Sequence, residues 1–259
     1  MKNNEDLLER AKRNEQNTMF YWYPKIKNLD IPQPKTKVYK FSKDEFKTIT
    51  KEEGIPKSLY ENCLPFAEKI GFPLFMRTDN SSCKHGWEKT CYVKTRESLK
   101  MHLFELLSTS AMQGWMSYND RGLIFRELLD LEIGHKYGVP FTAFYGNFPV
   151  NKERRYFIKN GKLQCRHPYW YPPAIENPSY NDWQGTLEYL NKETSEEVLL
   201  LTKYAQKVAD MFNGYWSVDF AKGIDGKWYL IDMARGEDSF HWIECEYCPD
   251  GQKRRYRQK

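Results

Sequence analysis

The sequence has no long hydrophobic run. Its longest uninterrupted aliphatic stretch is Val198 to Leu201, whereas a helix that spans a bilayer needs about 20 apolar residues. The first 17 residues carry charges along their length and lack the apolar region of a signal peptide. The expected location is therefore cytoplasmic, without a membrane partner, and the six cysteines are expected to be reduced thiols.

Paired cysteine motifs are scarce. Cys245 and Cys248 form a single C-x-x-C, and the two remaining isolated cysteines, Cys63 and Cys165, have no cysteine close by in sequence. A second short group consists of Cys83, His85 and Cys91. Because a structural zinc site needs four ligands, usually as two such pairs, ordinary thiols are the preferred interpretation and a metal at Cys245 and Cys248 is the alternative.

Familiar nucleotide-binding motifs are missing as well. The sequence contains neither a G-x-x-x-x-G-K-[ST] loop nor a G-x-G-x-x-G turn after a strand. A nucleotide site, if the chain has one, must therefore use a different architecture.

The net charge of +5 comes from one end of the chain. The 40 basic and 35 acidic residues include five basic and no acidic residues in the segment 251–259. Without that segment the charges balance, which argues against a protein that coats nucleic acid over its whole surface. Any contact with nucleic acid is expected only through this basic tail.

Periodicity and cap signals predict a mixture of helices and strands, hence an α+β fold. The expected helices are 4–17, 58–70, 97–112 and the segment after Thr194, where Thr194 and Glu197 form a capping box. The expected strands are 37–41, 72–77, 123–129 and 141–145, and 171–180 is expected to be a loop. We divide the chain into an N-terminal helical segment (1–19), a main domain of two subdomains (20–250) and the tail (251–259).

Asn160-Gly161 lies between two strand-like runs and predicts a hairpin with a two-residue turn. That register places Arg155 opposite Arg166, and Arg154 opposite His167. Like charges in such positions are unfavourable on a sheet. The preferred explanation is that both arginines extend into solvent, and the alternative is a bound phosphate or carboxylate.

Asp225-Gly226 predicts a second hairpin, in which Asp219 lies directly opposite Asp232. Two carboxylates about 4 Å apart repel by roughly 4 kcal/mol at an effective dielectric constant near 20. A divalent cation such as Mg²⁺ would remove that cost. A shared proton or an exposed edge would do so too, and Gly223 offers a longer loop with a shifted register.

These residues occur in an order that resembles the ATP-grasp superfamily, and within it the R2K group. The likeness rests on a strand ending in Arg77, a polar loop with Lys84, the run Phe125 to Leu129, the run Glu153 to Ile158, and the final strands with Asp219 and Asp232. It covers roughly residues 20–245. The chain is also distantly similar to the cell-division-cycle chaperones that assemble a translation initiation factor.

The resemblance implies an ATP-grasp fold, in which two lobes with antiparallel sheets enclose a nucleotide cleft. It implies that Arg77 and Lys84 hold the phosphates of ATP and that loop 79–86 covers them. The backbone of Glu127, Leu128 and Leu129 would meet the adenine, Arg155 would face the γ-phosphate, and Asp219 and Asp232 would bind Mg²⁺.

The chain also departs from the pattern of that superfamily. Many members carry Glu-x-Asn on the last strand, where this sequence has Asp232-Met233-Ala234, so a metal ligand is missing or comes from elsewhere, with Glu237 as the candidate. Arg77 stands where many relatives have lysine. Glu153 either orients Arg155 or marks a strand end.

The resemblance implies an ATP-dependent carboxylate–amine ligase, with Lys84 and Arg155 as catalytic residues. The alternative is an ATP-binding assembly chaperone or protein-binding module without ligase turnover, and a third hypothesis is a nucleic-acid-modifying ligase that uses the tail. His167 and His241 are more readily structural than proton-transferring. Substrate selectivity is expected in loops 135–152 and 167–182.

Overall fold

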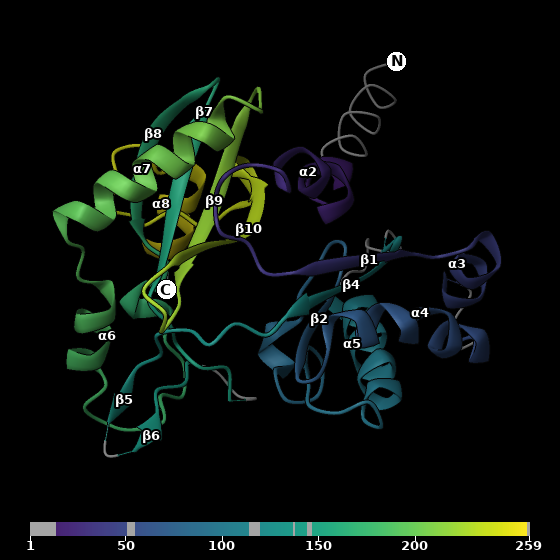
Figure 1. Ribbon diagram of the computed structural model, residues 1–259. Helices are drawn as coiled ribbons and strands as arrows, with labels where there is room; N and C mark the ends of the chain where they lie inside the picture. Colours follow the sequence, from purple (N-terminus) through teal and green to yellow (C-terminus); the bar gives the residue numbers. More distant parts are fainter. Residues whose placement is uncertain (1–13, 51–54, 114–119, 137, 144–146, 258–259) are drawn as a thin grey trace.

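Two four-stranded antiparallel sheets organise the chain, with strand orders β1-β4-β2-β3 and β10-β9-β7-β8. The fold is that of a computed structural model, which describes residues 14–50, 55–113, 120–136, 138–143 and 147–257. Each sheet carries helices on a face, so the two sheets form two lobes (Figure 1). The architecture is α+β, as predicted. Within the described residues, no helix has both the length and the apolar character required to cross a bilayer.

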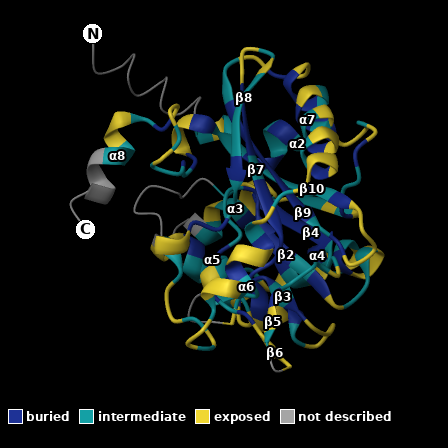
Figure 2. Ribbon diagram, turned by 90° about the vertical axis from the view of Figure 1, so that its left-hand side faces the viewer, coloured by how far each residue is buried: buried dark blue, intermediate teal, exposed yellow. Residues whose placement is uncertain are grey.

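The first lobe contains the sheet of β1 to β4 and three helices. Its elements are β1 (Thr36–Lys40), α3 (Lys43–Thr50), α4 (Lys57–Ile70), β2 (Leu74–Thr78), η1 (Lys84–Gly86), β3 (Tyr92–Val93), α5 (Leu99–Gln113) and β4 (Gly122–Glu127). Helices α4 and α5 pack on the sheet through a core that includes Leu59, Leu74, Leu103 and Phe125. The buried strands lie at the centre of the molecule in Figure 2.

The second lobe contains the other sheet. Its elements are β7 (Glu153–Lys159), β8 (Lys162–Pro168), η2 (Pro172–Ala174), α6 (Gln184–Asn191), α7 (Ser195–Ala209), β9 (Tyr215–Lys222), β10 (Trp228–Arg235), η3 (Gly236–Asp238) and α8 (Asp250–Arg257). Helix α7 covers β7 and β8. A small sheet of β5 (His135–Lys136) and β6 (Val139–Pro140) lies between the two lobes in sequence.

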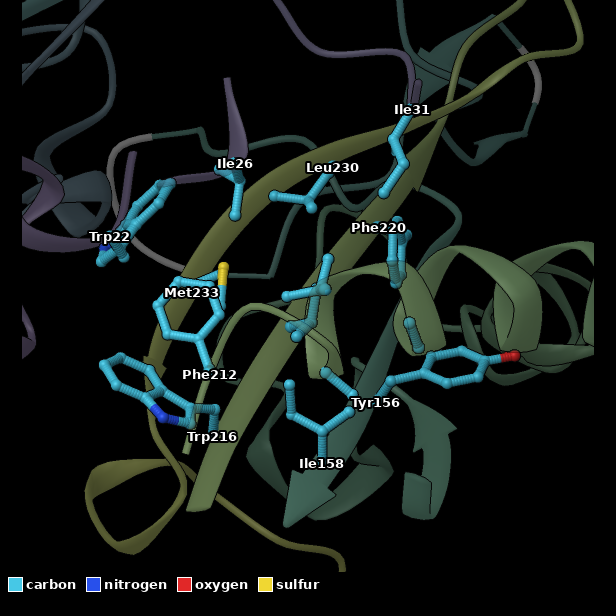
Figure 3. Close-up of a cluster of buried hydrophobic side chains, with 14 of the residues drawn as sticks. Trp22, Ile26, Ile31, Tyr156, Ile158, Phe212, Trp216, Phe220, Leu230 and Met233 are labelled. Carbon is cyan, nitrogen blue, oxygen red and sulfur yellow. The ribbon is translucent and has the colours of Figure 1, made fainter. Parts of the chain in front are cut away.

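Helix α2 (Met19–Ile26) belongs to the core of the second lobe although it precedes the first lobe in sequence. Trp22 and Ile26 are fully buried near Trp216 of β9 and Met233 of β10 (Figure 3). The backbone N–H of Met19 also donates to the carbonyl of Asp79 in the first lobe, at 2.8 Å. Helix α2 therefore contacts both lobes.

Most predicted elements are present within a residue or two of their expected ends. The capping box at Thr194 is confirmed, because the Thr194 hydroxyl accepts from the Glu197 N–H at 3.2 Å and the Glu197 carboxylate accepts from the Thr194 N–H. The strand expected at 141–145 is wrong in its described part, where Thr142 forms only an isolated bridge to Pro149. Most of the helix expected at 4–17 lies outside the described residues. The boundary drawn at 250/251 falls one residue inside α8.

The first predicted hairpin has a different register from the expected one. Lys159 pairs with Lys162 and Ile158 with Leu163, as expected next to the turn, but a bulge then shifts the pairing by one residue. The expectation that Arg155 lies opposite Arg166 is therefore wrong, since Arg155 lies opposite His167. The expectation that Arg154 lies opposite His167 is wrong for the same reason, since Arg154 lies opposite Pro168.

The second hairpin reaches the expected pairing by an unexpected route. Gly223 pairs with Lys227 through its N–H at 2.8 Å, so the loop has three residues, 224–226, and Gly226 takes the positive φ of 80° that this loop requires. A bulge at Ile231 then restores the register, and Asp219 lies opposite Asp232. The longer loop and the bulge cancel, which is why the simpler assumption predicted the correct pair.

Candidate functional site: a charged cleft between the lobes

A cleft of about 720 Å³ lies between the two lobes and is lined from both of them. Strands β2 and β4 line it from the first lobe, and strands β7, β9 and β10 from the second. The linker that follows β4 forms part of its wall. The predicted residues in the lining are Arg77, Lys84, Glu127, Leu128, Leu129, Asp219 and Asp232. Tertiary structure thus brings seven of the eight predicted site residues together.

Arg77 and Arg126 face the cleft from neighbouring strands of the first sheet. Both are almost fully buried. Burial, followed by repulsion from Arg77, lowers the pKa of Arg126 to about 10. The Arg126 Nη1 donates to the carbonyl of Ile231, and its Nε has no hydrogen-bond partner among the described residues. Two buried guanidinium groups beside each other favour an anion in the cleft.

Lys84 extends from η1 into a pocket of aromatic rings. Its Nζ donates to the Tyr169 hydroxyl at 2.6 Å and lies 4.4 Å from the centre of that ring. Burial lowers the pKa of Lys84, but the opposing effects of Tyr169 and Glu153 are together larger and raise the pKa above its usual value. The lysine therefore stays protonated within the cleft.

The two opposed carboxylates each have an arginine partner. Asp219 receives two hydrogen bonds from Arg155, at 2.8 Å from Nε and 2.7 Å from Nη2. Asp232 pairs with the Nη1 of Arg77 at 2.9 Å. The repulsion expected between the carboxylates is thus balanced by positive charge from β7 and β2.

Arg155 itself is not among the described residues that line the cleft, although Asp219, its ion-pair partner on the neighbouring strand, is. Its Nη1 donates to the carbonyl of Phe240 at 3.2 Å, and its guanidinium lies 4.5 Å from the centre of the Tyr169 ring. Burial opposes the charged form, but the charge of Asp219 and its hydrogen bonds raise the pKa of Arg155 above its usual value. The group remains a fixed positive charge.

Glu153 contributes a third carboxyl group, and the sequence did not decide its role. It is 4% exposed and lines the cleft. Burial raises its pKa, with Lys84 opposing the shift and Asp219 adding to it. The side chain thus belongs to the charged part of the cleft lining, together with Lys84 and the carboxylate pair.

The end of β4 and the linker that follows it are held by two different segments of the chain. Glu127 exchanges hydrogen bonds with Lys35, donating its N–H to the Lys35 carbonyl at 2.9 Å and accepting the Lys35 N–H on Oε2 at 3.1 Å. Farther along, the carbonyl of Asp130 accepts from the N–H of Ile224 at 2.9 Å. The carboxylate of Glu127 therefore has a backbone partner within the protein.

Arg126, Glu153 and Tyr169 also line the cleft, although none of them was among the predicted site residues. Arg126 had a signal in the sequence, since an arginine inside an otherwise apolar strand must find a polar partner when it is buried. Tyr169 had none. Its contacts with Lys84 and Arg155 join residues that are far apart in sequence or on different strands, and they form only in the folded chain.

The weaker nominations have other surroundings. Glu237 pairs with Arg235 at 2.9 Å and is not part of the lining of the cleft among the described residues. Burial lowers the pKa of His167 to about 3 and that of His241 to about 4, so both imidazoles are neutral at physiological pH.

The donor set of the cleft fits a hard divalent cation. Asp219 and Asp232 are opposed on neighbouring strands and line one cavity, and Glu153 lines it too. Carboxylate oxygens are the ligands that Mg²⁺ prefers. Each of the two aspartates is balanced by an arginine, so a cation here would share them with Arg155 and Arg77.

Comparison with known proteins gives the family of this chain. Residues 67–242 match the family described as ATP-grasp domain, R2K clade family 3. Among curated proteins none matches. The matched segment begins in α4 and ends just after His241, so it contains every residue predicted for the site.

Solved structures share the same fold. C-terminally truncated Cdc123 from Schizosaccharomyces pombe has a TM-score of 0.56 and 15% identity, and the match covers 93% of each chain. An ADP complex of PurK, N5-carboxyaminoimidazole ribonucleotide synthetase, has a TM-score of 0.52 and 13% identity over 90% of this chain and 48% of that one. Carboxyaminoimidazole ribonucleotide synthase from Aspergillus clavatus, complexed with ATP, has a TM-score of 0.50 and 12% identity, covering 87% of this chain and 46% of that one.

At these identities the structural likeness concerns the fold, and this chain spans about half the length of the two synthases. The fold class predicted from the sequence is confirmed. Because the family match extends over more than half of the residues, this chain belongs to the ATP-grasp proteins, in family 3 of the R2K clade.

Proposed function

We propose that the interlobe cleft binds Mg-ATP and that the protein is an ADP-forming carboxylate–amine ligase. The observation that carries the proposal is the charge arrangement of the cleft. Buried cationic groups from the first lobe face a pair of opposed carboxylates on the second. Phosphate oxygens would pair with the cationic groups, and a bridging Mg²⁺ would bind the carboxylates. ATP-grasp relatives with bound ATP and ADP support the choice of nucleotide.

Arg77, Lys84 and Arg126 are the proposed phosphate ligands. Arg126 contributes a buried Nε without a partner among the described residues, and leaving such a donor unpaired costs about 1–3 kcal/mol. A phosphate oxygen would remove that cost. The backbone of Leu128 and Leu129, in the linker wall of the cleft, is proposed to meet the adenine together with Glu127.

Asp219 and Asp232 are the proposed Mg²⁺ ligands. Binding of the ion would supply positive charge that Arg155 and Arg77 supply in this structure. Both arginines would then be available to the phosphates. This exchange gives Arg155 its proposed role, because its guanidinium group can contact the transferred phosphoryl group only after Mg²⁺ has replaced it as the cation paired with Asp219.

The proposed reaction has two steps. A substrate carboxylate attacks the γ-phosphorus of ATP and releases ADP, and an amine then displaces phosphate from the acyl-phosphate. Lys84 and Arg155 would stabilise the negative charge of the transferred phosphoryl group, and the cleft would hold the reactants in line. The two substrates are an unidentified carboxylate and an unidentified amine, including those of a peptide or protein.

A second candidate is an ATP-binding assembly protein without ligation. The likeness to Cdc123 favours it, because that match covers 93% of both chains while the synthases extend far beyond this chain. The departure from Glu-x-Asn at Asp232-Met233-Ala234 points the same way, since it removes one side-chain ligand for the metal.

ATP binding and ADP release test the proposal separately. Lys84→Met should weaken ATP binding by roughly 10- to 150-fold, which corresponds to the loss of one charge-assisted hydrogen bond of about 1.5–3 kcal/mol. Titration calorimetry with Mg-ATP measures this. Asp232→Asn should abolish the Mg²⁺-dependent part of the binding and of any ADP release in the presence of pooled carboxylates and amines.

Asp225→Asn is the matched control for Asp232→Asn. Asp225 lies at the tip of the same hairpin, outside the cleft, and its Oδ1 accepts the Lys227 N–H at 3.1 Å, which an amide oxygen can also do. Unchanged Mg-ATP affinity in Asp232→Asn would remove that residue from the site. Saturable ATP binding without ADP release, across all acceptor pools, would favour the assembly protein over the ligase.

A further inference from the structure

A group of soft metal ligands lies away from the interlobe cleft, where the C-terminal segment meets strand β8. Cys165 of β8, His241 and Cys245 offer ligand atoms that all lie within 4.8 Å of one another. The Cys165 Sγ is 3.7 Å from the His241 Nε2. It is the one convergent group of three or more such side chains among the residues that the structure describes.

The surroundings of this group favour a cation rather than three unlinked side chains. His241 is fully buried, and its Nε2 is the ring atom that lies beside the Cys165 sulfur. Two adjacent thiols become thiolates when a divalent metal binds them.

Cys248 is a third cysteine close to this group in sequence and offers a fourth ligand. It follows Cys245 in the C-x-x-C, and its N–H donates to the Cys245 carbonyl at 3.0 Å, so the four residues form a turn. Its side chain is buried, with Sγ 3.8 Å from the Pro249 carbonyl rather than within the group of three. Three cysteines and one histidine are a ligand set of closed, structural zinc sites.

We propose that Cys165, His241, Cys245 and Cys248 form a structural zinc site. Two adjustments accompany binding: the Cys248 side chain turns toward the other sulfurs, and the metal replaces the Tyr215 hydroxyl, which is 2.8 Å from the His241 Nε2. Both are side-chain changes on a backbone that already brings the ligands together. The proposal is independent of ligase activity, because none of the four residues lines the interlobe cleft.

The site fastens the segment after η3 to the edge of the second sheet. That segment also supports the charged centre, since the Phe240 carbonyl, next to His241, accepts from Arg155. The His241 ring stacks on Phe157 of β7 with centroids 3.7 Å apart. Zinc would thus hold in place the Phe240 backbone that accepts a hydrogen bond from Arg155, without contacting ATP.

The metal content of the full chain tests the proposal. The protein is expressed with a tag that does not bind metal, purified with a thiol reductant, and measured by inductively coupled plasma mass spectrometry. We expect one zinc per chain. Cys165→Ala and Cys245→Ala should each lose most of it, whereas Cys63→Ala, a change at a buried cysteine in the core of the first lobe, should keep it.

Cobalt replacement gives a readout that needs no variant. The wild-type protein refilled with Co²⁺ should show the thiolate-to-metal charge-transfer band of a tetrahedral sulfur site, and Cys248→Ala should show a weaker one. An equal band in Cys248→Ala would overturn the assignment of that ligand. Wild-type protein that stays free of zinc after reconstitution, or a mass lower by two hydrogens from a Cys165–Cys245 disulfide, would overturn the site.

Discussion

The buried pair of Arg155 and Asp219 allows a test in which Mg²⁺ takes over the role of a side chain. Their side chains are 13% and 7% exposed, and two hydrogen bonds join them. Arg155→Met keeps much of the side-chain volume but leaves the Asp219 carboxylate buried without its cation. Breaking one partner of a buried pair costs about 3–5 kcal/mol. We expect Arg155→Met to lower the free energy of unfolding by that amount in Mg²⁺-free buffer, as measured by urea denaturation.

Addition of Mg²⁺ should return part of this stability if Asp219 faces the metal. An ion that binds only the folded state stabilises it by about 2.7 kcal/mol at 100 times its dissociation constant. Mg²⁺ alone should raise the unfolding free energy of the wild-type protein by less, because Arg155 already neutralises the charge of Asp219 there. Denaturation curves at increasing Mg²⁺ concentrations therefore measure the affinity of the carboxylate for the ion.

Two variants make the test decisive. Arg155→Met combined with Asp219→Asn removes both charges and should be less destabilised than the sum of the single changes, with no Mg²⁺ effect. Arg166→Met removes a partly exposed arginine, paired with Glu193 at 2.9 Å, and should cost at most about 1 kcal/mol. Equal Mg²⁺ stabilisation of the single and double variants would refute the assignment of Asp219 to the metal.

Three further predictions concern stability. Burial, followed by repulsion from a neighbouring carboxylate, raises the pKa of Asp79 to about 7. The protonated Asp79 side chain therefore stabilises the folded state fully below pH about 4, and this stabilisation is lost as the pH rises to 7. The Asn side chain of Asp79→Asn cannot ionise, so the stability of this variant relative to the wild type should rise between pH 4 and pH 8, by at most about 4 kcal/mol in urea titrations. A difference in unfolding free energy that does not change with pH would contradict the reasoning. Trp22→Ala empties a fully buried position in α2 and should cost about 3–5 kcal/mol, whereas a thermal shift no larger than that of a surface change would show that α2 is not anchored. Thr194→Ala removes the hydroxyl that accepts the Glu197 N–H and should cost about 1 kcal/mol, with Thr194→Ser retaining most of the stability.

Local elements were readable from the sequence because their determinants are local. The capping box at Thr194 satisfies backbone donors within one turn, and Asn160-Gly161 supplies the positive φ values that a tight turn needs. Both elements occur where they were predicted. Helix α2 was missed because it contains Pro24 and a run of aromatic residues, and it is stabilised by packing against β9 and β10 rather than by its own periodicity.

Register depends on more than the turn. The pairing of Asp219 with Asp232 was predicted correctly, yet it depends on a three-residue loop and on a bulge at Ile231. In the first hairpin an equivalent bulge had no compensating change, and the predicted partners of Arg154 and Arg155 were wrong. Bulges follow the packing of a whole strand on its neighbours, which a turn sequence does not contain.

The sequence by itself determined the α+β composition, the opposed aspartates and the order of residues that resembles the ATP-grasp superfamily. Only the tertiary structure decided what those charges meet: Arg155 on Asp219, Arg77 on Asp232 and Tyr169 on Lys84. It also joined Cys165 to a histidine and a cysteine more than 70 residues away. The physical reason is that charge pairing and metal ligation depend on distance in space, and a chain fixes such distances only after its apolar faces have packed.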